Sequence, residues 1–245
     1  LLLFTLTFPL LPLFKNLISS CLFNVAKLLL ATFSFYILVL YSLVIFDLKY
    51  KNKNLFEVSM KRCHWVDEKS PIYVKYHDEE WGVPKYDDRE LFELLVLESF
   101  QAGLSWITVL KKREAFRVAF DNFDVEKVAK YDENKVNELL KNKEIIRSKG
   151  KINSAINNAK IFIEIQKEFG SFSNYIWKFT NNKIIKNTSD EQFVSTPLSD
   201  EISKDLKMRD MKYVGTIIIY SYLQAIGVVN DHESDCFKRQ TVLQF

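Results

Sequence analysis

From residue 60 onward, hydrophobic positions recur at intervals of three and four residues, a pattern that predicts helices along most of this part of the chain. One predicted helix begins at Asp87 or Asp88, either of which can cap its N-terminus, and ends before Gly103. The longest predicted helix covers about 148–169 and ends at Gly170. The sequence lacks the alternating pattern typical of strands, so it predicts one compact all-α domain.

Shorter helices are expected wherever a side chain that can cap an N-terminus precedes hydrophobic residues. The capping candidates are Ser105, Asp124, Asp132, Ser173 and Ser199. A hydrophobic helix is expected over 215–226, whereas the polar segment 181–196 is expected to form an irregular loop.

Residues 1–59 differ from the rest because they are strongly hydrophobic and contain neither glycine nor methionine. Within them, 28–46 is an uncharged run of 19 residues, long enough to cross a bilayer as a helix. The lysines between 49 and 53 that follow it would leave the C-terminal part in the cytoplasm. The sequence predicts either a membrane anchor or translated upstream sequence before a true start at Met60.

We therefore divide the chain into a hydrophobic leader at 1–59, a functional domain at 60–238 and a short tail at 239–245. The leader holds five lysines and two acidic residues, so it accounts for the whole net charge of +3. The functional domain is then balanced in charge, and net charge gives no evidence for an anionic partner. Three cysteines are too few for a disulfide framework, which favours a reducing, cytoplasmic location.

Glu98 is the first residue whose position indicates chemistry. It follows Leu91 by seven residues, Leu94 by four and Leu95 by three, which places it on the hydrophobic face of the predicted helix. A carboxylate there is costly unless it is paired or has a function. The alternative is a residue at the edge of the core that reaches solvent or pairs with a lysine.

Cysteines and histidines near both ends of the functional domain could bind one metal ion. His232 and Cys236 are four residues apart, so on a helical turn they face the same way. With Cys63 and His77 they would form a site of two cysteines and two histidines, the donor set of structural zinc. His64 is a rival ligand, and the alternative is that these are unrelated buried thiols and surface histidines.

Aromatic side chains are dense in a stretch of 42 residues that contains Trp65, Tyr73, Tyr76, Trp81 and Trp106. Such density is typical of a core, but aromatic rings can also stack on a nucleobase.

A turn is expected between two helices at Lys212, Tyr213, Val214, Gly215 and Thr216. The glycine lets the backbone turn tightly and lets its amides approach an anion. The alternative is a simple connection between helices. The basic clusters 111–113 and 147–151 could add contacts to phosphate.

Several segments resemble the DNA-3-methyladenine glycosylase I family. They are Cys63 with Trp65, the runs 73–84 and 101–114, the segments 145–147 and 150–152, and the C-terminal segments 214–216 and 229–232. The resemblance covers about 60–238 and does not extend into the leader.

This resemblance implies the all-α fold of the helix-hairpin-helix glycosylases, with a structural zinc ion that ties the two ends of the domain together. The ligands that match by position are Cys63, His77, His232 and Cys236, and His64 does not match.

The resemblance also implies a pocket for the damaged base, with Glu98 as the acid that recognises it. The matching pocket aromatics are Tyr73, Tyr76 and Trp106, with Trp65 close by. The hairpin that grips the DNA backbone would lie at 212–216.

The implied substrate is alkylated double-stranded DNA, from which 3-methyladenine is flipped out and released with water as the nucleophile. We expect a monofunctional enzyme and a monomer without an obligate protein partner. Asp231 stands where many helix-hairpin-helix glycosylases carry a catalytic aspartate. We rank it behind Glu98 and interpret it as support for the zinc ligand His232.

Two other classes of protein are compatible with parts of the pattern. A zinc-stapled helical DNA-binding protein without catalysis would not need a buried acid at Glu98. A membrane-anchored scaffold would depend on the leader and not on the pocket.

Overall fold

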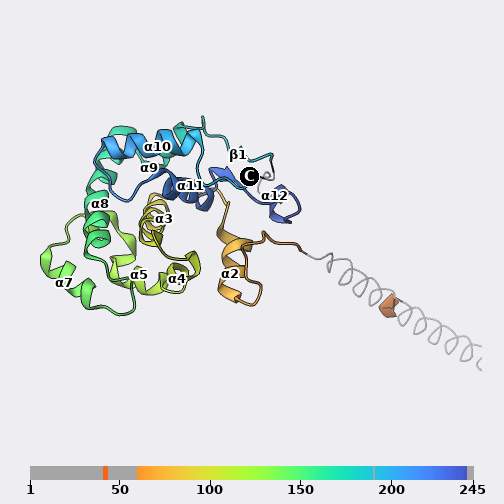
Figure 1. Cartoon of the computed structure of the whole chain (residues 1–245), viewed down its shortest axis with the longest axis horizontal. Helices are drawn as coiled ribbons and strands as arrows, with labels where there is room; N and C mark the ends of the chain where they lie inside the picture. Colours follow the sequence, from red (N-terminus) through yellow and green to blue (C-terminus); the bar gives the residue numbers. More distant parts are fainter. Residues whose placement is uncertain (1–40, 44–59, 190, 242–245) are drawn as a thin grey trace, which may run out of the picture. The chain divides into compact units, whose positions relative to one another are not determined.

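The computed structural model of the protein describes residues 41–43, 60–189 and 191–241 (Figure 1). The chain divides into two units, Leu1–Met60 and Lys61–Phe245. Of the predicted membrane helix at 28–46, only 41–43 are described, and these are helical. Among the described residues, no helix combines the length and hydrophobicity needed to cross a bilayer.

The second unit is mostly helical, as the periodicity predicts. Its elements are α2 (Pro71–Lys75), the π-helix η1 (Tyr76–Glu80), α3 (Asp88–Gln101), α4 (Trp106–Leu110), α5 (Arg113–Ala119), the 3-10 turn η2 (Asp121–Phe123), α6 (Val125–Val128), α7 (Glu133–Lys141), α8 (Lys149–Phe169), α9 (Phe172–Lys178), β1 (Ile185–Lys186), α10 (Pro197–Met208), α11 (Thr216–Ala225), β2 (Val229–Asn230) and α12 (Lys238–Thr241). The short strands pair in parallel, with Ile185 opposite Val229, a pairing that the sequence does not predict.

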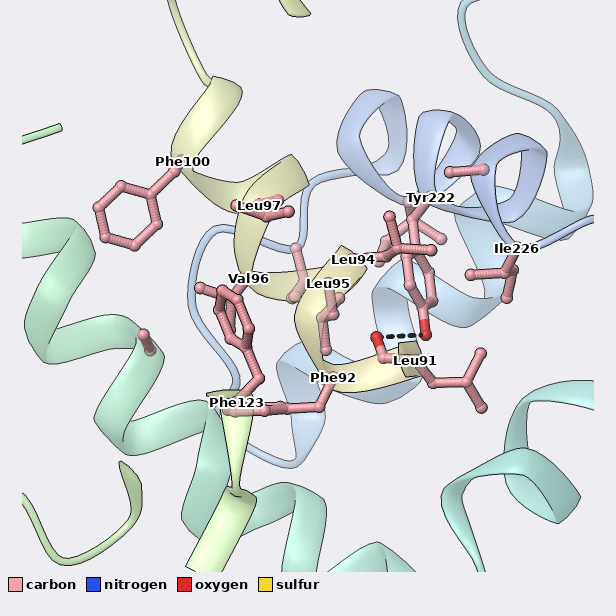
Figure 2. Close-up of a cluster of buried hydrophobic side chains, with 14 of the residues drawn as sticks. Leu91, Phe92, Leu94, Leu95, Val96, Leu97, Phe100, Phe123, Tyr222 and Ile226 are labelled. Atoms are coloured by element: carbon pink, nitrogen blue, oxygen red, sulfur yellow. Dashed lines mark hydrogen bonds between the residues drawn. The ribbon is translucent and has the colours of Figure 1, made fainter. Parts of the chain in front are cut away.

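Helix α3 is buried all the way round. Every residue from Leu91 to Phe100 is buried, against α11 on one side and α8 and η2 on another. Figure 2 shows its side chains directed both toward Phe123 and toward Tyr222 and Ile226. The Tyr222 hydroxyl donates a hydrogen bond of 3.1 Å to the Leu91 carbonyl. Apolar side chains therefore anchor this helix from every direction.

The two adjacent aspartates at the start of α3 have separate roles. The Asp87 side chain accepts hydrogen bonds from the Arg89 and Glu90 amides and caps α3. The Asp88 side chain instead accepts bonds from the Phe172 and Ser173 amides, 2.8 Å each, at the first turn of α9. This pair of caps fixes α9 against the start of α3.

Two predicted caps are wrong by two or three residues. Helix α9 is capped by Ser171 and not by Ser173, and α10 by Thr196 and not by Ser199. In α10 the two hydroxyl residues form a reciprocal capping box, and Pro197 occupies the first helical position, where its fixed φ is favourable. The predicted ends of α8 are confirmed: Ser148 caps its start, and Gly170 ends it with φ of +81°.

Arg113, part of a basic cluster expected to contact phosphate, lies inside the protein. Its guanidinium donates to Glu80 and Glu93, with 2.5 Å for each N–O distance. Arg117 also donates to Glu93, at 3.0 Å. Because Glu80 ends the π-helix and Glu93 belongs to α3, this ion-pair network joins the two elements.

We expect Arg113→Met to lower the free energy of unfolding by about 3 kcal/mol, because it leaves a buried carboxylate without its closest partner. Urea denaturation of the full chain measures this. Lys149→Met is the control, since it removes an exposed ion pair with Glu133 that contributes at most about 1 kcal/mol. Equal losses in the two variants would contradict a structural role for the network.

Candidate functional site

A cavity of about 310 Å³ lies beside the carboxyl end of α3. The residues that line it are Trp65, Tyr73, Tyr76, Trp81, Glu98, Gln101, Trp106, Ser221, Gln224, Asp231, His232 and Glu233, together with His64 and five residues between 187 and 193. The predicted base-recognising acid and the four predicted pocket aromatics all belong to this lining. They come from four different segments of the chain, which the fold brings to one place.

Glu98 has an unusual environment for a carboxyl group. Its exposed fraction is 4%, and the described residues give its Oε2 atom no hydrogen-bond partner. Burial raises the pKa of Glu98 to about 8, since removal from water penalises the charged form. The carboxyl group is therefore mostly protonated at neutral pH when the cavity holds no ligand.

Aromatic rings form one wall of the cavity. Tyr76 and Trp106 lie 5.3 Å apart between ring centroids, and Trp65 lies 5.2 Å from Tyr73 and 5.0 Å from Trp81. Burial, and secondly the charge of Glu98, raises the pKa of Tyr76 well above its ordinary value, so its hydroxyl stays protonated. The indole Nε1 of Trp106 is buried without a partner in the described structure. Two residues of the lining, Glu98 and Trp106, thus each carry a buried polar atom without a partner in the described structure.

A second cluster includes His77, which follows Tyr76 in the π-helix. Ligand atoms of Cys63, His77 and Cys236 all lie within 4.8 Å of one another, and the three residues are buried. The Cys236 Sγ atom lies 3.4 Å from Nε2 of His77, and Nδ1 of His77 lies 2.8 Å from a carboxylate oxygen of Asp78. A carboxylate on the far nitrogen is the usual way in which a metal-binding imidazole is oriented.

His232, the fourth predicted ligand, is not among the three residues whose ligand atoms lie within 4.8 Å of one another. Its Nε2 atom is buried without a partner, its ring centroid lies 5.3 Å from that of His77, and its Nδ1 lies 3.0 Å from the Asn230 side-chain oxygen. Burial lowers the pKa of His232 to about 3, which keeps the imidazole neutral, the form that binds metal. Two thiols and two imidazoles suit Zn²⁺.

His64, the rival ligand, lies apart from this cluster. Its side chain is 61% exposed and contacts the carboxylate of Glu233 and the amide of Gln192.

The turn at 212–216 connects α10 to α11, as expected. Asn158 of α8 holds it by a pair of hydrogen bonds, 2.9 Å from the Lys212 amide and 2.8 Å to the Lys212 carbonyl. Lys212 and Tyr213 are exposed, whereas Val214 is buried and its carbonyl accepts a bond from Ser203. Gly215 is the N-cap residue of α11.

Asp231 lines the cavity, and its carboxylate accepts hydrogen bonds from residues outside the cysteine and histidine cluster. It accepts hydrogen bonds from Asn187 (2.6 Å), Gln224 (2.5 Å) and Tyr220 (3.0 Å). The partner of His232 that the sequence reasoning sought in Asp231 is Asn230.

No sequence pattern marks the part of the lining that comes from α11 and from the segment 187–193. Ser221 and Gln224 lie among hydrophobic residues of a helix and resemble ordinary surface positions. The segment 187–193 has no periodicity, so no local signal marks it.

Comparisons with known proteins show the family to which the chain is similar. The family model described as methyladenine glycosylase matches residues 65–239. DNA-3-methyladenine glycosylase 1 of Escherichia coli is 47% identical over 180 residues, which cover 72% of this chain and 96% of that protein. DNA-3-methyladenine glycosylase of Haemophilus influenzae is 43% identical over 178 residues, covering 71% of this chain and 96% of the relative.

Solved structures are similar over the same region. A crystal structure of 3-methyladenine DNA glycosylase I is 46% identical, with a TM-score of 0.70, and the match covers 72% of this chain and 98% of that one. A structure of 3-methyladenine DNA glycosylase I from Staphylococcus aureus, which describes how that enzyme recognises 3-methyladenine, is 35% identical, with a TM-score of 0.70. The match covers 74% of this chain and 97% of that one. This chain therefore belongs to the methyladenine glycosylase family.

Proposed function

We propose that this chain hydrolyses the N-glycosidic bond of 3-methyladenine in alkylated double-stranded DNA, with the damaged base bound between Glu98, Tyr76 and Trp106. The class of enzyme follows from membership of the family and from the names of its relatives. One observation supports the choice of residues: the lining of the cavity includes a buried carboxyl group whose Oε2 has no partner among the described residues.

The base must leave the DNA stack to reach this cavity, as in other enzymes that act on a base within a duplex. Alkylation gives the adenine a positive charge and weakens its glycosidic bond, so the leaving group needs little acid catalysis. Glu98 would bind the cationic base as a carboxylate, accept a hydrogen bond from its exocyclic amine and release its own proton. An undamaged adenine is neutral and gains less from this charge.

The aromatic wall would fix the plane of the base. Trp106 offers a stacking surface and an unused N–H donor, while the protonated hydroxyl of Tyr76 is a further donor or acceptor. Tyr73 and Trp65 belong to the same lining, with ring centroids 5.2 Å apart. Among the described lining residues there is no lysine that could form a Schiff base, so we propose water as the nucleophile.

The turn at 212–216 would hold the DNA backbone, with the exposed Lys212 and Tyr213 and the amide of Gly215 toward phosphate. Val214 would contribute by packing in the core. We propose that the protein acts as a cytoplasmic monomer, since its substrate is DNA and no step requires a second copy.

We propose that Cys63, His77, His232 and Cys236 hold one structural zinc ion. A bound ion would add its binding free energy to folding and would link the first and last segments of the unit. These segments already meet through the hydrogen bond from the Phe237 amide to the Lys61 carbonyl, 3.0 Å long.

We expect Glu98→Gln to lower the rate of 3-methyladenine release from methylated DNA at least a hundredfold, because a neutral amide loses the charge that complements the base. The measurement is chromatography of released bases. Glu90→Gln, an exposed position on the same helix, should keep full activity. Normal release by the Glu98 variant would remove this residue from the mechanism.

The pKa of Glu98 predicts a pH-dependent stability. Because this pKa is about 8 in the folded chain and near 4.5 in a free carboxyl group, the folded state holds the extra proton between these values. The stability of wild type relative to Glu98→Gln should then fall as pH rises from 5 to 8, by up to about 1.4 kcal/mol per unit. Urea denaturation at both pH values tests this, and a constant difference would show that the buried group stays charged.

We expect the purified chain to contain one zinc ion per molecule by mass spectrometry, and Cys236→Ser to lower both zinc content and melting temperature. His64→Ala is the control, since His64 lies outside the cluster, and it should retain zinc. Absence of zinc from the wild-type chain, or its full retention by Cys236→Ser, would contradict the proposed ligands.

A further inference from the structure

We propose that Lys151 is a positioning residue for the base cavity: its ammonium group holds the carboxyl end of α3 and does not contact DNA. This inference rests on the proposed function of the cavity. It assigns a different role to a lysine in the basic cluster 147–151, for which the sequence favoured phosphate contacts.

Lys151 lies in the first turn of α8 and reaches across to α3. Its Nζ atom donates hydrogen bonds of 2.8 Å to the Phe100 carbonyl and 2.7 Å to the Ala102 carbonyl. The last carbonyls of a helix have no partner within the helix, and the end of the helix dipole there favours a cation. The ammonium group therefore caps α3 and uses two of its three N–H donors for these bonds.

The capped segment joins two walls of the cavity. Glu98 lies one helical turn before Ala102, and Trp106 follows Ala102 by four residues. Gln101, between the two bonded carbonyls, itself lines the cavity. After it the chain reverses at Gly103, whose φ is +81°. Lys151 thus fixes the segment that connects Glu98 to Trp106 of the aromatic wall.

The other basic cluster contains the same use of a lysine. The Nζ atom of Lys112 donates to the carbonyls of Lys143 and Glu144, at 3.2 and 2.8 Å. One lysine in each cluster thus binds backbone carbonyls, and this role can be distinguished from a phosphate contact by the salt dependence of DNA binding. A lysine that binds phosphate releases counterions, so its removal reduces the slope of log K against log salt by about one.

The test compares Lys151→Met with Lys160→Met in the full chain. Lys160 is an exposed residue of the same helix and lies outside the site. Three quantities are measured: kcat and KM for release of 3-methyladenine from methylated DNA, the affinity for free 3-methyladenine by tryptophan fluorescence, and the salt dependence of DNA binding.

For Lys151→Met we expect kcat to fall at least tenfold and free 3-methyladenine to bind at least tenfold more weakly, with an unchanged salt slope. Lys151→Arg keeps a cation at the cap and should recover much of the lost affinity for the free base. Lys160→Met should match wild type in base release and base affinity.

A reduced salt slope with normal affinity for the free base would overturn the proposal and assign Lys151 to phosphate. Unchanged values in all three measurements would also overturn it. If Lys151→Met does not fold, as judged by circular dichroism, the comparison is made with Lys151→Gln, which keeps a donor but loses the charge. Failure of the wild-type chain to release 3-methyladenine would instead refute the proposed function itself.

Discussion

Helix α3 must be covered on every side, because ten consecutive residues from Leu91 to Phe100 are withdrawn from water. Such a helix cannot lie on a surface, so α8, η2, α9 and α11 pack around it and set the shape of the unit. Near the carboxyl end of α3, Glu98 lines the cavity. The burial that stabilises the fold is thus also what removes water from this carboxyl group.

Polar groups that lack partners are informative here because they are so few. Among the described residues, buried side-chain nitrogen or oxygen atoms without a hydrogen bond occur only in Glu98, Trp106 and His232. All three residues line the cavity, and the ring of His232 also lies 5.3 Å from that of His77 between centroids. A protein interior leaves polar groups unpaired at a cost in free energy, which is recovered when a ligand binds them.

Local sequence patterns predicted the parts of the site that depend on one element. The spacing of Glu98 from three leucines predicted that its side chain is buried, and the preferences of capping residues predicted both ends of α8. Patterns could not show that Arg113 would turn inward to Glu80 and Glu93, or that Lys151 would cap α3, because these partners lie 20 to 51 residues apart. A long basic side chain has the same local signature whether it meets solvent, phosphate or a carbonyl group.

The π-helix places two adjacent residues in two different sites. Tyr76 lines the cavity, and His77, the next residue, belongs to the cluster with Cys63 and Cys236. A movement of the π-helix would therefore displace both Tyr76 and His77. If a metal ion in the proposed cluster strengthens the binding of a base in the cavity, the base strengthens the binding of the metal ion by the same factor.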